Sequence, residues 1–307
     1  MAEVKAAQVA RQLDYPADRL EIIIARGRQP SVQRNVATRA AQGDWIYFLD
    51  DDALPAPGNL RRAATLWDDP SVAMIGGPNI CPPEASELEK VFAVVLSSWL
   101  AFGPSRARYL PVGPQRNAGE KELILCNLMA RRDDLLRHGG FNEALYPNEE
   151  NALMDQLHAD RKRLVYDPEF IVHRRPRRTL PAFLRMLRTY GRGRAEQFRS
   201  NPTPGSAMNF VPPLFCLYLV LLPVIGLLPL PMLLKEVALL PLSFYALAVL
   251  IQTLASIPSA GLMRSFLALP LVVASHVFYG YGFWRGLFTK LKATTGRSDV
   301  PVKLEKS

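Results

Sequence analysis

Three consecutive aspartates, Asp50, Asp51 and Asp52, offer the clearest chemistry in this chain. They directly follow the apolar run 45–49, which has the length and composition of a short buried strand. In an extended chain Asp50 and Asp52 point the same way, while Asp51 points the other way. Two neighbouring carboxylates repel each other unless a cation lies between them. Because oxygen ligands favour hard ions, Asp50 and Asp52 indicate a Mg²⁺ or Mn²⁺ site, and a solvated acidic turn is the alternative.

A second group of candidate residues lies further along the chain. Glu149 and Glu150 open a predicted helix over 148–160, where a carboxylate can accept a proton from a hydroxyl or simply satisfy the helix dipole. His173 follows a short extended segment and is either a metal ligand or a hydrogen-bonded structural histidine. Arg185 and Arg188 lie on a basic amphipathic helix predicted for 178–190, and they suit phosphate groups or an anionic lipid surface equally well.

The elements that must position these residues alternate between helix and strand. Such an order predicts an α/β fold with a mostly parallel sheet and helices on both faces. Helices are expected over 2–13, 32–41, 59–67, 86–101, 133–137 and 148–160, and strands over 20–25, 45–49, 72–75, 123–126, 164–166 and 170–172. Residues 103–122 read as a long loop. Ligands of such sheets bind beyond the carboxyl ends of the strands, which is where the aspartates fall.

The composition changes near residue 205. Of the 307 residues, the first two thirds are charged and mixed, whereas three later segments, 210–234, 237–257 and 265–288, are apolar and each long enough to cross a bilayer core of about 30 Å. We therefore divide the chain into a catalytic domain (1–176), an interface helix and linker (177–206), a transmembrane region (207–289) and a basic tail (290–307). The three cysteines have no metal-binding spacing and indicate reduced thiols in a cytosolic setting.

Taken together, these residues resemble the inverting family-2 glycosyltransferases of the Rossmann-like GT-A fold, in particular bacterial membrane-anchored enzymes of polysaccharide synthesis. Residues 30–35 resemble the approach to the family's DxD motif, and Asp50-Asp51-Asp52 resembles the motif itself. Residues 139–143, Gly-Gly-Phe-Asn-Glu, are similar to the family's GGF segment. Glu149-Glu150 falls where the family has an acidic pair, and Arg185 and Arg188 resemble its membrane-proximal arginine motif.

The resemblance implies an enzyme that moves a sugar from a nucleotide-sugar to a polyprenyl-linked or membrane-proximal saccharide. It implies Glu150 as catalytic base with Glu149 as its helper, and Asp50, Asp52 and His173 as metal ligands. It also implies that the aspartates, Arg185 and Arg188 face the donor phosphates. The expected location is the bacterial inner membrane, in contact with lipids, with the catalytic domain facing the cytosol. The alternatives are a catalytically inactive scaffold or a metal-dependent nucleotidyltransferase. Nucleic-acid binding is disfavoured, because the arginine-rich segment 161–199 lacks interleaved aromatic residues.

Two features depart from the family pattern. No strand precedes the first helix, and residues 25–28 read Ala-Arg-Gly-Arg where relatives often have Asp-Asp-Gly-Ser. Both fall on the expected nucleotide pocket. Because Ile22-Ile23-Ile24 signals burial on both faces of a strand, we expect an apolar strand encoded upstream of Met1. The basic tail after three apolar segments conflicts with the positive-inside tendency, which favours an even number of crossings and a cytosolic tail.

Overall fold

The structure is a computed structural model that describes residues 4–144, 149–200, 202, 204–290 and 301–306. The described residues form two compact units. Unit 1 falls within Met1–Glu84, Pro104–Arg175 and Leu291–Ser307, and unit 2 within Ala85–Gly103 and Pro176–Lys290. Each unit is described separately below.

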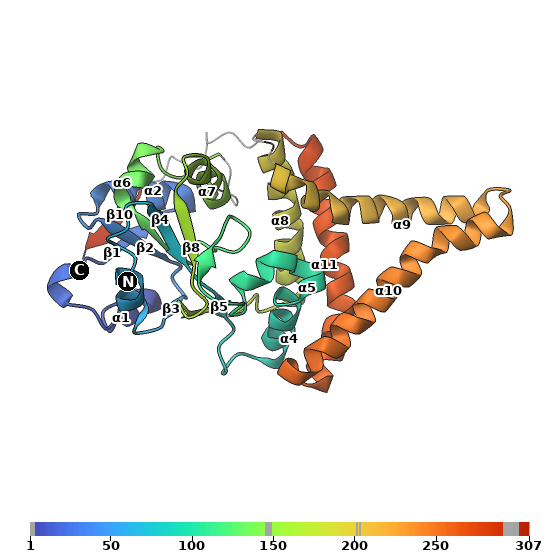
Figure 1. The fold of residues 1–307 in the computed structure, drawn as a ribbon, viewed down its shortest axis with the longest axis horizontal. Helices are drawn as coiled ribbons and strands as arrows, with labels where there is room; N and C mark the ends of the chain where they lie inside the picture. Colours follow the sequence, from blue (N-terminus) through green and yellow to red (C-terminus); the bar gives the residue numbers. More distant parts are fainter. Residues whose placement is uncertain (1–3, 145–148, 201, 203, 291–300, 307) are drawn as a thin grey trace. The chain divides into compact units, whose positions relative to one another are not determined.

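A five-stranded sheet forms the centre of unit 1, with the strand order β2-β7-β4-β8-β6 (Figure 1). Its strands are β2 (Trp45–Leu49), β7 (Asn127–Arg131), β4 (Val72–Gly76), β8 (Arg163–Tyr166) and β6 (Arg116–Asn117). β4 and β8 are parallel, whereas β7 runs antiparallel to both of its neighbours. The expected α/β class is confirmed, but the sheet is mixed and not mostly parallel, because β7 lies antiparallel between β2 and β4 and β6 pairs antiparallel with β8.

The fourth predicted strand, 123–126, is wrong. Leu123, Leu125 and Cys126 are buried, but this segment pairs with no strand among the described residues, and β7 begins only at Asn127. A short apolar run predicts a strand, but any buried segment can carry such a run, whether or not it pairs with another strand. Asn127 then starts the ladder, with its side-chain Nδ2 donating to the carbonyl oxygens of Phe170 (2.6 Å) and Pro78 (3.2 Å).

The sheet has an apolar core on each face, because successive side chains of a strand point to opposite sides. On β7, Leu128 and Ala130 join one cluster of buried residues, while Met129 joins the other. β8 alternates in the same way, with Leu164 and Tyr166 in the first cluster and Val165 in the second. Both faces of the sheet are thus covered by packed side chains, as expected for a sheet with helices on both faces.

Among the described residues of unit 1, five α-helices accompany the sheets: α1 (Lys5–Ala10), α2 (Pro30–Ala40), α3 (Asn59–Ala64), α6 (Arg132–Arg137) and α7 (Glu149–Ala159). α2 begins two residues earlier than expected, because Pro30 suits the first helical turn and the Gln29 side chain accepts a 2.6 Å hydrogen bond from the Val32 amide. Short 3₁₀ turns occur at Ala17–Arg19 and Gly103–Arg108.

Two smaller sheets complete unit 1. β9 (Val172–His173) lies between β3 (Leu54–Pro55) and β5 (Asn79–Ile80). β1 (Ile23–Arg26) pairs antiparallel with β10 (Lys303–Lys306), a strand in the basic tail. A 3.0 Å ion pair between Arg26 Nε and Glu305 Oε1 supports this pairing, and Lys306 Nζ lies 2.8 Å from Glu21 Oε1. The tail therefore folds as part of unit 1.

Unit 2 is helical, with α4 (Glu87–Leu96), α5 (Trp99–Phe102), α8 (Leu180–Ser200), the 3₁₀ turn Pro204–Phe210, α9 (Val211–Leu227), α10 (Met232–Ala260) and α11 (Leu262–Phe288). α8 packs closely along α11, where a side chain on Gly282 would collide with the carbonyl of Arg188. Within this unit, Figure 1 shows α9 and α10 extending away from α11 as a hairpin.

Three helical segments of unit 2 are long and apolar enough to cross a membrane: Gly205–Leu227, Met232–Ala260 and Leu262–Phe288. The expected apolar segments are confirmed, with changed bounds. The first helix ends at Leu227 rather than continuing to 234, because Pro229 and Pro231 interrupt the backbone hydrogen bonding that a helix requires.

Candidate active site

The three aspartates follow β2 without a gap, and two of them contact the same arginine. Arg174 Nη2 lies 3.1 Å from Asp50 Oδ2, and Arg174 Nε lies 2.5 Å from Asp52 Oδ1. Asp51 is exposed, and its backbone carbonyl accepts a hydrogen bond from the Ala6 amide. Asp50 and Asp52 thus converge on one cation, brought together by the turn that follows β2, in which the Ala53 amide donates to the Asp50 carbonyl at 3.0 Å.

His173 is placed near this pair by the small sheet around β9. Its backbone is paired with Leu54, two residues beyond Asp52, and with Ile80 on the other side. Its ring atom Nδ1 is buried and has no hydrogen-bond partner among the residues that the structure describes. A buried ring nitrogen without a partner is costly, and a cation would relieve that cost.

Asp50, Asp52 and His173 are the side chains that could bind a divalent cation here. Asp50 and Asp52 supply carboxylate oxygens that converge on the Arg174 guanidinium, and His173 adds a nitrogen without a partner. Within the described parts of the chain, no three His, Cys, Asp or Glu side chains are already gathered as a metal site. The residue types fit Mg²⁺ or Mn²⁺, and Arg174 provides the positive charge between the two acids.

The second pair of acids begins α7. The Glu149 and Glu150 side chains are buried, and Arg34 Nη1 donates to Glu149 Oε1 at 2.9 Å. Burial and, after it, the charge of Glu150 raise the pKa of Glu149 to about 7, although Arg34 acts to lower it. A carboxyl group that titrates near neutral pH can take part in proton transfer.

Arg34 connects the two pairs of acids. From α2 it donates to Glu149 and also, through Nη2, to Asp50 Oδ1 at 3.3 Å. Its side chain is only 20% exposed, so the two contacts are held in a shielded environment. The result is an unbroken series of alternating charges that runs from Glu149 through Arg34, Asp50 and Arg174 to Asp52.

The next residue of α2 holds the glycine turn. Asn35 Oδ1 accepts from the Phe141 amide at 2.8 Å, and Asn35 Nδ2 donates to the Phe141 carbonyl at 2.9 Å. The same Nδ2 donates to Glu143 Oε1 at 3.0 Å. Gly140 has a φ of +79°, and a side chain there would collide with Asn35 Oδ1. Only glycine suits this position, because φ is positive and the space is filled.

Cys126 lies beside the acidic pair but is not a nucleophile. Burial and, after it, the charge of Asp50 raise the pKa of its thiol to about 12. The thiol therefore stays protonated at neutral pH, and only a thiolate attacks or binds a metal well. All three cysteines are free thiols, as the sequence predicts.

The structure brings Asp50, Asp52, Glu149, Glu150 and His173 into unit 1. Arg185 and Arg188 belong instead to α8 of unit 2, where Arg185 is exposed and Arg188 half-buried. Their assignment to the donor phosphates stays a prediction. Sequence reasoning missed Arg34 and Arg174 as members of the site, although Arg34 falls inside the motif-like segment 30–35 and Arg174 follows His173.

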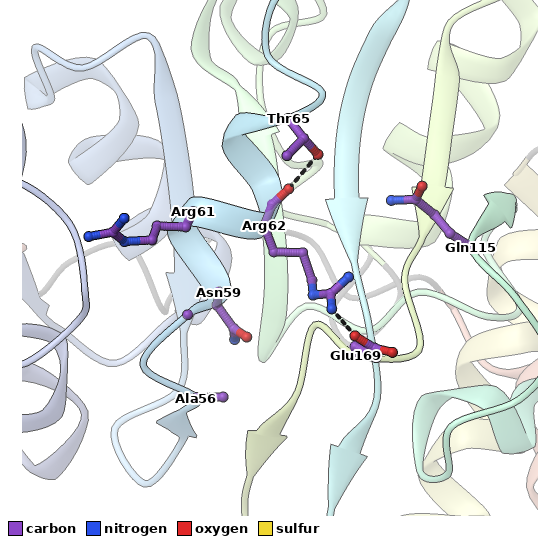
Figure 2. Close-up of a pocket in the computed structure, with 8 residues that line it drawn as sticks. Ala56, Asn59, Arg61, Arg62, Thr65, Gln115 and Glu169 are labelled. Atoms are coloured by element: carbon purple, nitrogen blue, oxygen red, sulfur yellow. Dashed lines mark hydrogen bonds and ion pairs between the residues drawn. The ribbon is translucent and has the colours of Figure 1, made fainter.

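A separate hollow of about 510 Å³ lies at α3 (Figure 2). Arg62, which lines this hollow, forms ion pairs with Glu169 and, at 3.2 Å, with Asp167. Figure 2 shows Arg62 directed at Glu169, with Gln115 on the opposite side of the hollow. Because neither acidic pair lines it, this hollow is not part of the site described above.

Comparison with known proteins relates part of this chain to a family. Residues 6–112 match the family model described as "Glycosyl transferase family 2". This stretch includes Arg34 and the three aspartates. With the glycosyltransferase relatives described next, the match over this segment supports a glycosyltransferase of the family-2 type.

Two curated relatives are the pre-mycofactocin glycosyltransferases of Mycobacterium tuberculosis strains CDC 1551 / Oshkosh and ATCC 25618 / H37Rv. Each is 29% identical over 162 residues, which is 53% of this chain and 33% of the relative. The chain thus matches a third of their length. A solved structure is 19% identical in sequence to this chain, with a TM-score of 0.41. Its title is "Mannosyltransferase PcManGT from Pyrobaculum calidifontis in complex with GDP-Man and Mn2+", and the match covers 84% of this chain and 66% of that chain.

Proposed function

We propose that this chain is a membrane-anchored glycosyltransferase that moves a sugar from a nucleotide-sugar to a lipid-linked or membrane-proximal acceptor by an inverting displacement. The observation that carries the proposal is the position of the acids. Asp50 and Asp52 end a strand within the segment that matches family 2, and Arg34 connects them to a buried glutamate pair. One pair suits the leaving diphosphate and the other suits the attacking hydroxyl.

At the donor end, the chain must stabilise the charge that grows on the departing diphosphate. Asp50 and Asp52 would hold a divalent cation with His173 as a further ligand, and the bound cation would neutralise phosphate oxygens. Arg174, which lies between the two acids, is the nearest positively charged side chain described for this role. An arginine can give a phosphate two parallel hydrogen bonds, which orients as well as stabilises it.

At the acceptor end, a base must remove the proton of the attacking hydroxyl. We assign this to Glu150, with Glu149 as the neighbour that orients it. The raised pKa of Glu149 supports the division, because a carboxyl group that is about half protonated near neutral pH reduces the negative charge beside the base. The new bond forms between the acceptor oxygen and the anomeric carbon as the bond to the diphosphate breaks, and the hydroxyl proton passes to Glu150.

The apolar helices support a membrane-bound acceptor. Three helical segments are able to span a bilayer, and α8 carries exposed arginines next to buried apolar side chains. A basic amphipathic helix suits an anionic membrane surface. We place the protein in a bacterial inner membrane, with unit 1 in the cytosol, acting on a polyprenyl-linked saccharide in cell-surface polysaccharide synthesis.

The test uses membranes that contain the full chain, incubated with radiolabelled nucleotide-sugars that differ in base and sugar. The expected result is label in the lipid-extractable fraction with release of a nucleoside diphosphate, and little of either with Glu150→Gln. Absence of both transfer and donor hydrolysis with every donor would favour an inactive scaffold. Release of pyrophosphate from a nucleoside triphosphate and a sugar phosphate would favour a nucleotidyltransferase.

A further inference from the structure

Arg174 occupies the position between Asp50 and Asp52 that suits a cation. Its guanidinium contacts Asp50 Oδ2 through Nη2 at 3.1 Å and Asp52 Oδ1 through Nε at 2.5 Å. Asp50 Oδ1, the other oxygen of the same carboxylate, accepts from Arg34 Nη2 at 3.3 Å. Both oxygens of Asp50 and one of Asp52 are thus bonded to arginine, so a divalent cation that uses these oxygens must replace a guanidinium.

The backbone of Arg174 is fixed, whereas its side chain is able to leave. The Arg174 amide donates to the Ile80 carbonyl at 3.0 Å, and β9, which ends at the preceding residue, is paired with a strand on each side. Opposite to it, the turn after β2 holds Asp50 through the hydrogen bond from the Ala53 amide. The Arg174 side chain is 22% exposed, so solvent reaches it. Rotation about its side-chain bonds can therefore carry the guanidinium off the acids without moving the strand.

The charges in this part of the site favour joint binding of a metal and a diphosphate. A divalent cation alone would have to release Arg174 from both acids into water, where the guanidinium gains no new partner. A diphosphate alone would meet Asp50 and Asp52, whose charges repel it. With both ligands present the acids hold the cation, and phosphate oxygens offer the guanidinium two parallel hydrogen bonds. Each ligand removes the obstacle to the other, which is the condition for coupled binding.

We propose that Arg174 is a resident cation of Asp50 and Asp52, and that it exchanges the two acids for the donor diphosphate when a divalent cation binds. Metal and nucleotide then bind tightly only together. The exchange rests on the proposed function, which supplies the two ligands. It gives Arg174 two successive partners, first the acids and then the phosphate oxygens.

A permanent contact is the competing interpretation, in which Arg174 takes the place of the metal throughout the reaction. Exchange is favoured, because an arginine that stays on both acids has its charge balanced by them. Asp50 and Asp52 carry one negative charge more than Arg174 supplies, and a diphosphate would bind against that excess. Arg34 does not make up the difference, because it is shared with the buried Glu149.

The test measures two affinities of the full-length chain in detergent. Binding of Mn²⁺ without nucleotide is followed by the electron paramagnetic resonance signal of free Mn²⁺, and binding of GDP and of UDP at saturating Mn²⁺ is followed by calorimetry. Arg174→Gln should bind Mn²⁺ at least about 5-fold more tightly than wild type. It should bind the preferred nucleotide at least about 5-fold more weakly. Opposite changes for the two ligands distinguish exchange from a structural role, because a variant that only loosens the site weakens both.

Arg175→Gln is the matched control, because Arg175 is the next residue along the chain and donates to the Glu84 carbonyl at 3.1 Å. Neither affinity should change in this control. Arg174→Lys keeps the charge but lacks the planar fork that contacts both acids at once. It should therefore shift both affinities in the same directions as Arg174→Gln and by less, and it tests the proposal even where the glutamine variant does not fold.

Mn²⁺ affinities of Arg174→Gln and Arg174→Lys no higher than that of wild type would overturn the proposal, and so would weaker binding of both ligands. Neither measurement requires sugar transfer. Transfer by wild type together with an unchanged Mn²⁺ affinity in Arg174→Gln would refute the exchange alone. Opposite shifts of the two affinities without transfer from any donor would support the exchange and refute the transferase activity.

Discussion

Arg34 and Glu149 form a buried ion pair, with 2.9 Å between Nη1 and Oε1, although 115 residues separate them in the sequence. Glu149 is almost fully buried, and no charged group would be stable there without a partner. Because Arg34 also contacts Asp50, the pair fixes the glutamates relative to the end of β2. This contact gives the proposed base and the proposed metal ligands a defined separation.

The pH dependence of stability should reveal the buried Glu149. Its folded-state pKa of about 7 lies above the ordinary value of 4.5, so the folded chain holds this proton more tightly than the unfolded chain. The stabilisation from protonation is complete below pH 4.5 and is lost as pH rises through 7. Between pH 5 and 8, Tm of wild type should therefore fall relative to Tm of Glu149→Gln, by roughly 3–6 °C.

Arg34→Gln provides the complementary variant. Removing the guanidinium takes away the influence that lowers the Glu149 pKa, so the midpoint of the pH effect should move to higher pH. Thermal unfolding in detergent at several pH values measures both variants. Parallel Tm curves for wild type and Glu149→Gln would show that Glu149 does not titrate in this range.

Glu150→Gln tests the assignment of the base. Glutamine keeps the size of the side chain but cannot accept a proton, so turnover should fall by about 10²–10⁴ while donor binding changes little. Initial rates of sugar transfer and donor affinity measure the two effects. Glu149→Gln is the matched control and should retain more activity. An inactive Glu149→Gln beside an active Glu150→Gln would exchange the two roles.

Two adjacent glycines offer a matched test of the turn before α7. Gly139 and Gly140 both have positive φ, but only a side chain at Gly140 meets another atom, the Asn35 side chain. Gly139→Ala should cost about 1–2 kcal/mol from backbone conformation alone, and Gly140→Ala should cost more. In an Asn35→Ala background the extra cost of Gly140→Ala should shrink, as thermal unfolding of the double mutant would show. Equal costs at the two glycines would contradict this packing.

The tail makes a prediction about topology. Because β10 pairs with β1, the tail and the amino-terminal part of unit 1 must lie on the same side of a membrane, so the number of crossings between them is even. α11 is the helix that we expect not to cross, since a third of its most apolar stretch is buried within the protein (33%) and Arg264 pairs with Glu87. Reporters at the two ends should both be active in the cytosol. A carboxyl-terminal reporter active only in the periplasm would refute this topology.

The local patterns of the sequence predicted local structure well. The strand over 45–49 has the predicted bounds, because its apolar run is a property of the strand itself. The helix beginning at Glu149 and the long apolar helices were predictable for the same reason. The sequence pattern that predicts each of these helices lies within the helix itself. Asp50 and Asp52 do contact one cation, but they do so from a turn after the strand and not from an extended chain.

The features that were missed depend on partners far away in the chain. Residues 123–126 carry the apolar pattern of a strand, and only the position of the neighbouring strands moves the ladder to Asn127. β10 has the charged composition of a solvated tail, and its pairing with β1 spans almost the whole sequence. Arg174 was missed because its contact with Asp52 joins residues 122 positions apart.

The central claim is that Asp50 and Asp52 hold a cation for sugar transfer, and one measurement addresses it most directly. Transfer rates of wild type, Asp50→Asn, Asp52→Asn and Asp51→Asn are compared over a titration of Mn²⁺ and of Mg²⁺ after chelation. Arg174 forms ion pairs with Asp50 and Asp52, whereas Asp51 is exposed, so Asp51→Asn should behave nearly as wild type. Asp50→Asn and Asp52→Asn should lose on the order of 10²–10³ in rate at saturating metal. Equal rates for Asp52→Asn and wild type, or full transfer in the presence of chelator, would contradict the account.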